Sequence, residues 1–228
     1  VWPEEDSSDS FFGTWLANRS ELESCLDEHQ AWLYVALSCD TENEDKRAAY
    51  NFFVQEIYPK IAPLDDALNR KMLSYPGLDT YQEPGFDRLI RSVQNALELY
   101  REENIPIQTE LKGLESQYAA LTGSLCIVYD GQEYTLPQAQ KFLKSHDRNR
   151  REKVYRLIMD QRAGISEKLQ GLMDRMLELR HQLAINAGFT NYRDYRFREL
   201  QRFEYGVQEC LTFHRLVRDY MVPLKEHL

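Results

Sequence analysis

The sequence predicts an all-α protein, a multi-helix array with long antiparallel helices and one small β-hairpin at about residues 125–135. Apolar residues recur at intervals of three and four through most of the 228 residues, which is the period of an amphipathic helix. Glycine (10) and proline (8) are scarce, whereas an all-β protein needs many turns. Only one segment, LCIVY followed by Asp130-Gly131, combines strand-forming residues with a hairpin turn.

The first part of the chain is predicted to form two helices after an irregular start. Residues 1–13 are acidic and serine-rich, and we expect them to form a lead-in without helix. Ser20 begins a capping-box pattern, which predicts the start of the first helix. A second helix is predicted to start at Asp40. Pro59 and Pro63 lie within it, and each removes a backbone donor, so a kink or break is expected there.

Helical patterns resume near Asp87, are interrupted at Pro106, and end at Gly123. The hairpin follows directly. We therefore expect residues 1–122 to form an N-terminal helical region, and residues 123–228 to comprise the hairpin and the helices after it.

The second part of the chain predicts four further helices. Thr135 begins a capping box with proline in the first turn, and Asp147 is the expected cap of the next helix. A long helix with one apolar stripe then ends at Gly188. Residues 191–200 are expected to form a short polar and aromatic connection. The last helix carries His214 on its apolar stripe, where a hydrogen-bonded core position is predicted.

Charge and cysteine content exclude several classes of protein. A net charge of -9 disfavours binding to nucleic acid. Residues 1–136 hold 10 basic and 25 acidic side chains, whereas residues 137–228 hold 18 and 12. The two segments would attract each other if they fold together, and chance with solvation of helix surfaces is an equal alternative explanation of this asymmetry. The longest apolar run, 31–37, is too short to span a membrane, and no signal peptide pattern is present. Four widely spaced cysteines predict mostly buried thiols in a cytoplasmic protein.

Candidate metal ligands are few. Cys25 and His29 are one helical turn apart, and Glu178 and His181 match the Glu-x-x-His spacing of carboxylate-bridged metal bundles. The bundle motif needs a second copy, and none is present. Both pairs are better interpreted as ordinary helix positions, although a metal-binding bundle stays an alternative.

Aromatic and cationic residues alternate in NYRDYRFREL. A surface on which Tyr192, Tyr195 and Phe197 lie among arginines such as Arg196 suits the binding of a peptide. The same pattern also suits ordinary packing between helices, which is the favoured interpretation from the residues alone.

The order of these segments resembles the oligoendopeptidase F family of zinc metallopeptidases, relatives of thimet oligopeptidase. The segment Ala187–Tyr195, A-G-F-x-N-Y-x-D-Y, is the most specific piece. The D-R-x-x-R run at Asp147–Arg151 and the stretch EENIPIQTELKGLESQYAALTG add to it, and residues 20–75 are compatible. The likeness covers most of the chain and is strong over about half of it.

The resemblance implies a largely helical, clam-like peptidase with a deep channel that admits short peptides. Its zinc is held by an H-E-x-x-H helix and a later glutamate, all downstream of Pro223 in the family pattern. The resemblance therefore assigns no catalytic or metal-binding residue here. It implies the N-terminal portion of the enzyme, a wall of the channel, with Tyr192, Tyr195 and Arg196 as candidate channel residues.

Further expectations follow from that resemblance. The chain alone should be inactive and bind no zinc, and its partners should be short peptides and the missing catalytic portion. Apolar helix faces left uncovered could also produce a homo-oligomer. The alternative is a non-catalytic helical scaffold or interaction protein derived from the same family.

Overall fold

The computed structural model of the protein describes residues 9–226, and these are mainly helical. The all-α prediction is confirmed. The elements in chain order are α1 (Asp9–Cys39), α2 (Glu44–Phe52), the π-helical segment η2 (Phe53–Ile57), α3 (Tyr58–Leu73), α4 (Phe86–Leu99), α5 (Asn104–Gly123), β1 (Cys126–Tyr129), β2 (Gln132–Thr135), α6 (Leu136–Ala139), the short 3-10 segment η3 (Gln140–Lys144), α7 (Arg148–Gly164), α8 (Ser166–Asn186), α9 (Tyr192–Glu199), α10 (Val207–Leu216), the π-helical segment η4 (Val217–Met221) and α11 (Val222–Glu226).

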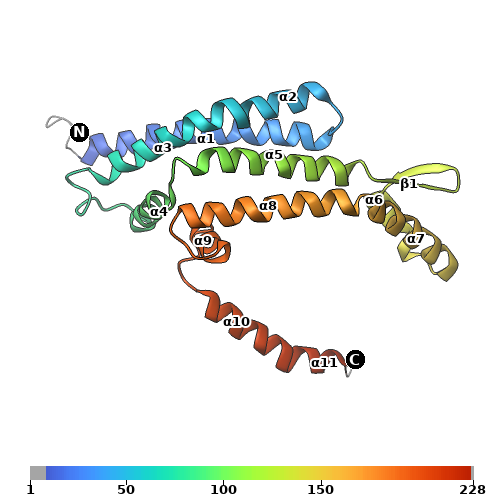
Figure 1. The fold of residues 1–228 in the computed structure, drawn as a ribbon. Helices are drawn as coiled ribbons and strands as arrows, with labels where there is room; N and C mark the ends of the chain where they lie inside the picture. The colour runs from blue at the N-terminus through green and yellow to red at the C-terminus, as the bar shows by residue number, and fades with distance from the viewer. Residues whose placement is uncertain (1–8, 227–228) are drawn as a thin grey trace.

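The long helices form a layered array (Figure 1). α1 runs alongside the α2–α3 unit, α5 lies next to α3, and α8 packs along α5 on the side away from α3. The short helices α4 and α9 pack together at one end of this array, and the hairpin with α6 and α7 extends from the other. The run from α10 to α11 leaves α9 as a separate arm, and none of its described side chains is buried. No described helix is long and apolar enough to cross a membrane.

The first helix begins earlier than predicted. α1 starts at Asp9, so the expected irregular lead-in is wrong for residues 9–13, and its part before residue 9 lies outside the described residues. The predicted start at Ser20 is also wrong, because the helix continues through that position. Phe12 is the cause: it is fully buried and stacks on Tyr75 with ring centroids 4.0 Å apart. Long-range aromatic packing therefore outweighs the local capping pattern.

The two prolines do not end their helix, and a distortion is present only near Pro59. The chain stays helical from Glu44 to Leu73, and the expected distortion is the π-helical turn Phe53–Ile57 immediately before Pro59. Pro63 lies inside α3. A wider turn is a usual way for a helix to accommodate backbone groups that lose their partners next to proline.

The hairpin prediction is confirmed in detail. Cys126 pairs with Thr135 and Tyr129 with Gln132, and both turn residues have positive φ, 53° at Asp130 and 76° at Gly131. Thr135 then caps α6 through the predicted capping box. The buried face of the hairpin forms a separate small core with α6 and α7.

Three further expectations are wrong, and two of them concern the second part of the chain. Residues 191–200 contain a real helix, α9, because Asn191 caps it and Tyr195 is buried against α8. His214 is exposed, because the arm that carries it packs against no core of the described residues. The thiols are not mostly buried: Cys25 and Cys39 are exposed, and the other two cysteines are partly exposed.

Ion pairs join the two oppositely charged segments. Arg175 binds Glu110 with N···O 2.7 Å, Arg180 binds Glu115 with N···O 3.3 Å, and Arg198 binds a glutamate of α4. The first two pairs link α8 to α5. Because all three are largely exposed, each adds little stability, and they fix the register of neighbouring helices rather than drive folding.

Candidate functional site

A cleft of about 320 Å³ opens between α3, α4, α5 and α9. Tyr58 of α3, Gln108 of α5, and Tyr195 and Glu199 of α9 are among its lining residues. A larger hollow of about 880 Å³ lies between the α1–α2 turn and α5. That hollow contains none of the residues predicted from the sequence, and its Arg47 is already bound to Glu44 and to a backbone carbonyl. We therefore take the smaller cleft as the candidate site.

Tyr195 forms the inner wall of this cleft. The Asn191 side chain caps α9 by accepting a hydrogen bond from the Asp194 backbone N–H at 3.0 Å, and this sets the phase of the helix. Tyr195 is consequently 2% exposed, with its ring 5.7 Å from that of Phe189. Burial, and then the nearby Glu199 carboxylate, raise the pKa of Tyr195 far above its usual range, although a hydrogen bond with Gln108 opposes them. The phenol is therefore neutral in the folded protein.

Gln108 links two tyrosines across the cleft. The Tyr58 hydroxyl donates to Gln108 Oε1 at 3.0 Å, and Gln108 also interacts with Tyr195. Burial and the Glu199 carboxylate raise the pKa of Tyr58 as well. The cleft thus presents neutral hydroxyl and amide groups from α3, α5 and α9 at one place.

The other two residues predicted from the sequence lie on the outer side of α9. Tyr192 is partly buried, 6.0 Å from the Tyr195 ring, and the Arg180 guanidinium is 5.9 Å from its ring centroid. Burial raises the pKa of Tyr192. Arg196 is exposed and pairs with Glu199. The structure therefore brings the two tyrosines together and places Arg196 beside the cleft residue Glu199.

Sequence reasoning missed Tyr58, Gln108 and a further residue of this region, Lys112 of α5. Its ammonium group lies 3.5 Å from the centroid of the Tyr58 ring, and burial lowers the pKa of Lys112. Gln108 and Lys112 are polar residues one helical turn apart on α5, beside its apolar stripe. This spacing indicates a polar face of the helix next to the core. The contact with Tyr58 could not be found from the sequence, because 54 positions separate it from Lys112.

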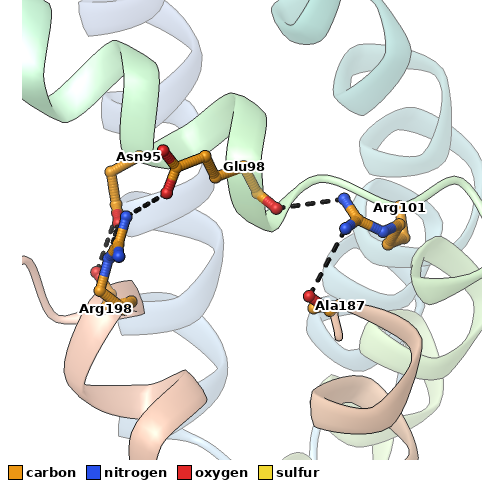
Figure 2. Close-up of polar contacts among 5 residues, drawn as sticks. All are labelled: Asn95, Glu98, Arg101, Ala187 and Arg198. Atoms are coloured by element: carbon orange, nitrogen blue, oxygen red, sulfur yellow. Dashed lines mark hydrogen bonds and ion pairs between the residues drawn. The ribbon is translucent and has the colours of Figure 1, made fainter. Parts of the chain in front are cut away.

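α9 is attached to α4 by a set of polar contacts (Figure 2). Arg198 Nε donates to Asn95 Oδ1 at 2.7 Å, and the Arg198 guanidinium also pairs with Glu98. Nearby, Arg101 donates to the carbonyl oxygens of Glu98 at 3.1 Å and Ala187 at 3.5 Å, which ties the end of α4 to the end of α8. The Arg198 contacts fix α9, and with it Tyr195, against α4.

No group of three or more His, Cys, Asp or Glu side chains in residues 9–226 could hold a metal ion. Glu178 is exposed and pairs with Arg175, and its Glu-x-x-His partner His181 is exposed too. The Cys25 thiol is also at the surface. The described residues therefore do not provide a zinc site.

With this geometry established, comparisons with known proteins identify the type of fold. Residues 4–100 match the model of the Peptidase M3 N-terminal domain. Among solved structures, a protein assigned as an oligoendopeptidase F matches 97% of this chain with a TM-score of 0.90 and 23% sequence identity. One from Bacillus anthracis str. Ames, also assigned as an oligoendopeptidase F, matches 90% with a TM-score of 0.83 and 22% identity. PZ peptidase A, solved with an inhibitor, matches 84% with a TM-score of 0.78 and 25% identity. No curated protein matches this sequence.

The resemblance inferred from the sequence is confirmed: the chain has the fold of the N-terminal portion of oligoendopeptidase F proteins. The matched region covers only 39%, 38% and 34% of the three solved chains, so this chain spans less than two-fifths of each.

Proposed function

We propose that the chain is the N-terminal portion of a cytoplasmic zinc metallo-oligopeptidase that hydrolyses short peptides. In this proposal, its helices form one wall of the substrate channel. The observation that carries it is the extent of the fold match: 97% of this chain corresponds to 39% of an oligoendopeptidase F. A fold match alone does not define an activity. The proposal therefore also depends on the neutral hydroxyl and amide groups of the cleft, which can form hydrogen bonds with a peptide backbone.

The proposed work of this chain is to admit and position peptides. Since the described residues hold no metal-binding group, we assign no step of hydrolysis to them. The 228-residue chain alone is expected to be inactive, and zinc would be bound by residues outside it. Compact protein substrates would be excluded by the narrowness of the channel.

Tyr192, Tyr195 and Arg196 are proposed as wall residues with different tasks. Tyr192, which is partly exposed, can offer a ring face to peptide side chains, and Arg196 can donate hydrogen bonds to peptide carbonyl oxygens. Tyr195 is buried, so it would not contact the peptide itself and would instead hold Gln108 and the Tyr192 ring in place.

A hydrolysis assay separates this proposal from a non-catalytic scaffold. The full-length protein and the 228-residue chain would each be incubated with a short internally quenched peptide and with a folded protein. We expect the full-length protein to cleave the peptide only and to lose activity on chelation, and the shorter chain to cleave neither. If the full-length protein, purified with its metal, cleaves no peptide in a varied set, the scaffold function is favoured instead.

A further inference from the structure

Five charged residues of α5, α8 and α9 lie near one another, and we call them the α5–α9 charge cluster: Lys112, Glu115, Arg180, Arg196 and Glu199. Of these, Glu199 lines the cleft. Arg180 Nη2 donates to Glu115 Oε1 at 3.3 Å, and Arg196 donates to Glu199. Lys112 is different, because it forms no salt bridge with any carboxylate of the described residues. Both carboxylates of the cluster are already paired with arginines, so Lys112 is the one cation of the cluster without an ion-paired carboxylate.

The position of Lys112 is unfavourable for an unpaired ammonium group. An ordinary surface lysine extends into water, but Lys112 is partly buried and lies over the Tyr58 ring. The ring face attracts the cation without neutralising it. Burial lowers the pKa of Lys112, and Glu115 offsets this only in part. A bound anion would compensate for the lost hydration of this charge.

Lys112 is also connected to the cleft. The Tyr58 ring contacts the ammonium group, while the hydroxyl of the same residue donates to Gln108 Oε1 in the cleft lining. Gln108 lies one helical turn before Lys112 on α5. An anionic group placed at Lys112 would therefore leave the rest of its molecule beside the neutral polar groups of the cleft.

We propose that Lys112 binds a carboxylate of the peptide that enters this cleft, an inference that rests on the proposed function. A single negative charge matches the single ammonium group of Lys112, which has no ion-paired carboxylate among the described residues. A phosphate dianion fits poorly, because Glu115, Glu199 and the nearby Asp65 would repel its second charge. In a peptide the carboxylate can belong to the C-terminus or to an Asp or Glu side chain, and the experiment distinguishes these two sources.

The test uses the full-length protein and two matched peptide pairs. One pair differs only in a free or an amidated C-terminus, and the other only in Glu or Gln at one internal position. For each pair, kcat/KM and the Kd of a fluorescent analogue are measured with the wild type, Lys112→Met and Lys112→Arg. Lys168→Met is the control, since Lys168 is an exposed lysine at the start of α8.

We expect Lys112→Met to weaken binding of the carboxylate form about ten- to hundredfold, the range for one charge-assisted hydrogen bond, and to leave the neutral form nearly unchanged. Lys112→Arg should restore much of the preference, and Lys168→Met should keep all of it. The peptide pair for which Lys112→Met abolishes the preference for the acid form shows whether Lys112 binds the C-terminal carboxylate or a side-chain carboxylate. Equal effects on both members of each pair, or a lower melting temperature with unchanged preference, would overturn the proposal and assign Lys112 to a contact within the protein.

The binding measurement keeps the two hypotheses separate. If the wild type binds the acid forms with a preference that depends on Lys112 but cleaves nothing, the carboxylate site stands and the proposed peptidase function fails. If it cleaves peptides with no preference between the acid and neutral forms, the peptidase function stands and the carboxylate site is refuted.

Discussion

Asn95 and Arg198 bind each other through two hydrogen bonds: Asn95 Nδ2 donates to the Arg198 carbonyl oxygen at 2.9 Å, and Arg198 Nε donates to Asn95 Oδ1 at 2.7 Å. One residue is on α4 and the other on α9, 103 positions apart in sequence. Asn95 is almost fully buried. This reciprocal pair is therefore a main attachment of the helix that carries Tyr195.

Replacing Asn95 by Ala should destabilise the protein by about 1–3 kcal/mol, because the substitution removes a buried side chain with two hydrogen bonds and leaves the partly buried Arg198 groups without that partner. Urea unfolding followed by circular dichroism measures this change. Ser92→Ala is the matched control, since Ser92 makes an exposed contact with Gln201 between the same two segments and should change stability by less than about 0.5 kcal/mol. Equal effects of the two substitutions would contradict the importance given to Asn95.

Phe12 provides a second test, at the start of α1. Phe12→Ala should cost about 3–5 kcal/mol, since the side chain is fully buried among aromatic rings and its removal leaves a cavity. Phe52→Ala is the control, because Phe52 is 60% exposed. The difference between the two variants in thermal unfolding measures the contribution of the buried ring. If Phe12→Ala and Phe52→Ala were equally stable, the Phe12 ring would not be a stabilising part of the core at the start of α1.

The Phe12 case also shows what the sequence could and could not predict. The hairpin, the Thr135 and Asp147 caps and the long helix α8 depend on neighbouring residues, so local patterns were sufficient for them. The true start of α1 depends on Tyr75, more than sixty positions away, and no local pattern contains that contact.

The candidate site, too, was predictable only where it depends on residues that are neighbours in the sequence. Tyr192 and Tyr195 were predicted because they lie in one short segment with a specific motif, although the segment was expected to be a connection and is helix α9. Tyr58, Gln108 and Lys112 were missed, because only the packing of α3 against α5 brings them together. His214 was predicted to lie in a core because its helix has an apolar stripe, yet none of the described side chains of that helix is buried.

Substitutions on α9 test the proposed channel wall. In the full-length protein, Tyr192→Ala and Arg196→Ala should raise KM for short peptides several-fold and leave kcat nearly unchanged, since these residues would bind substrate equally before and during the reaction. Arg193→Ala is the control, because Arg193 is an exposed arginine of the same helix, and its one ion pair within residues 9–226 is with the adjacent Asp194. Unchanged KM values across a series of peptides would exclude this face of α9 from the channel.

Tyr195 gives a prediction about pH. Its pKa is raised by burial, so the folded state holds the phenolic proton more tightly than the unfolded state, in which tyrosine titrates near pH 10. The stabilisation is fully present below about pH 10 and is lost as the pH rises from there towards the raised pKa of the folded state. We therefore expect the free energy of unfolding to fall more steeply above about pH 10 in the wild type than in Tyr195→Phe. Because Tyr58 and Tyr192 have pKa values shifted in the same direction, the variant should retain part of the slope. Urea unfolding at several pH values from about 8 to 11 measures both slopes, and identical slopes would show that the Tyr195 hydroxyl is not protected from ionisation by the fold.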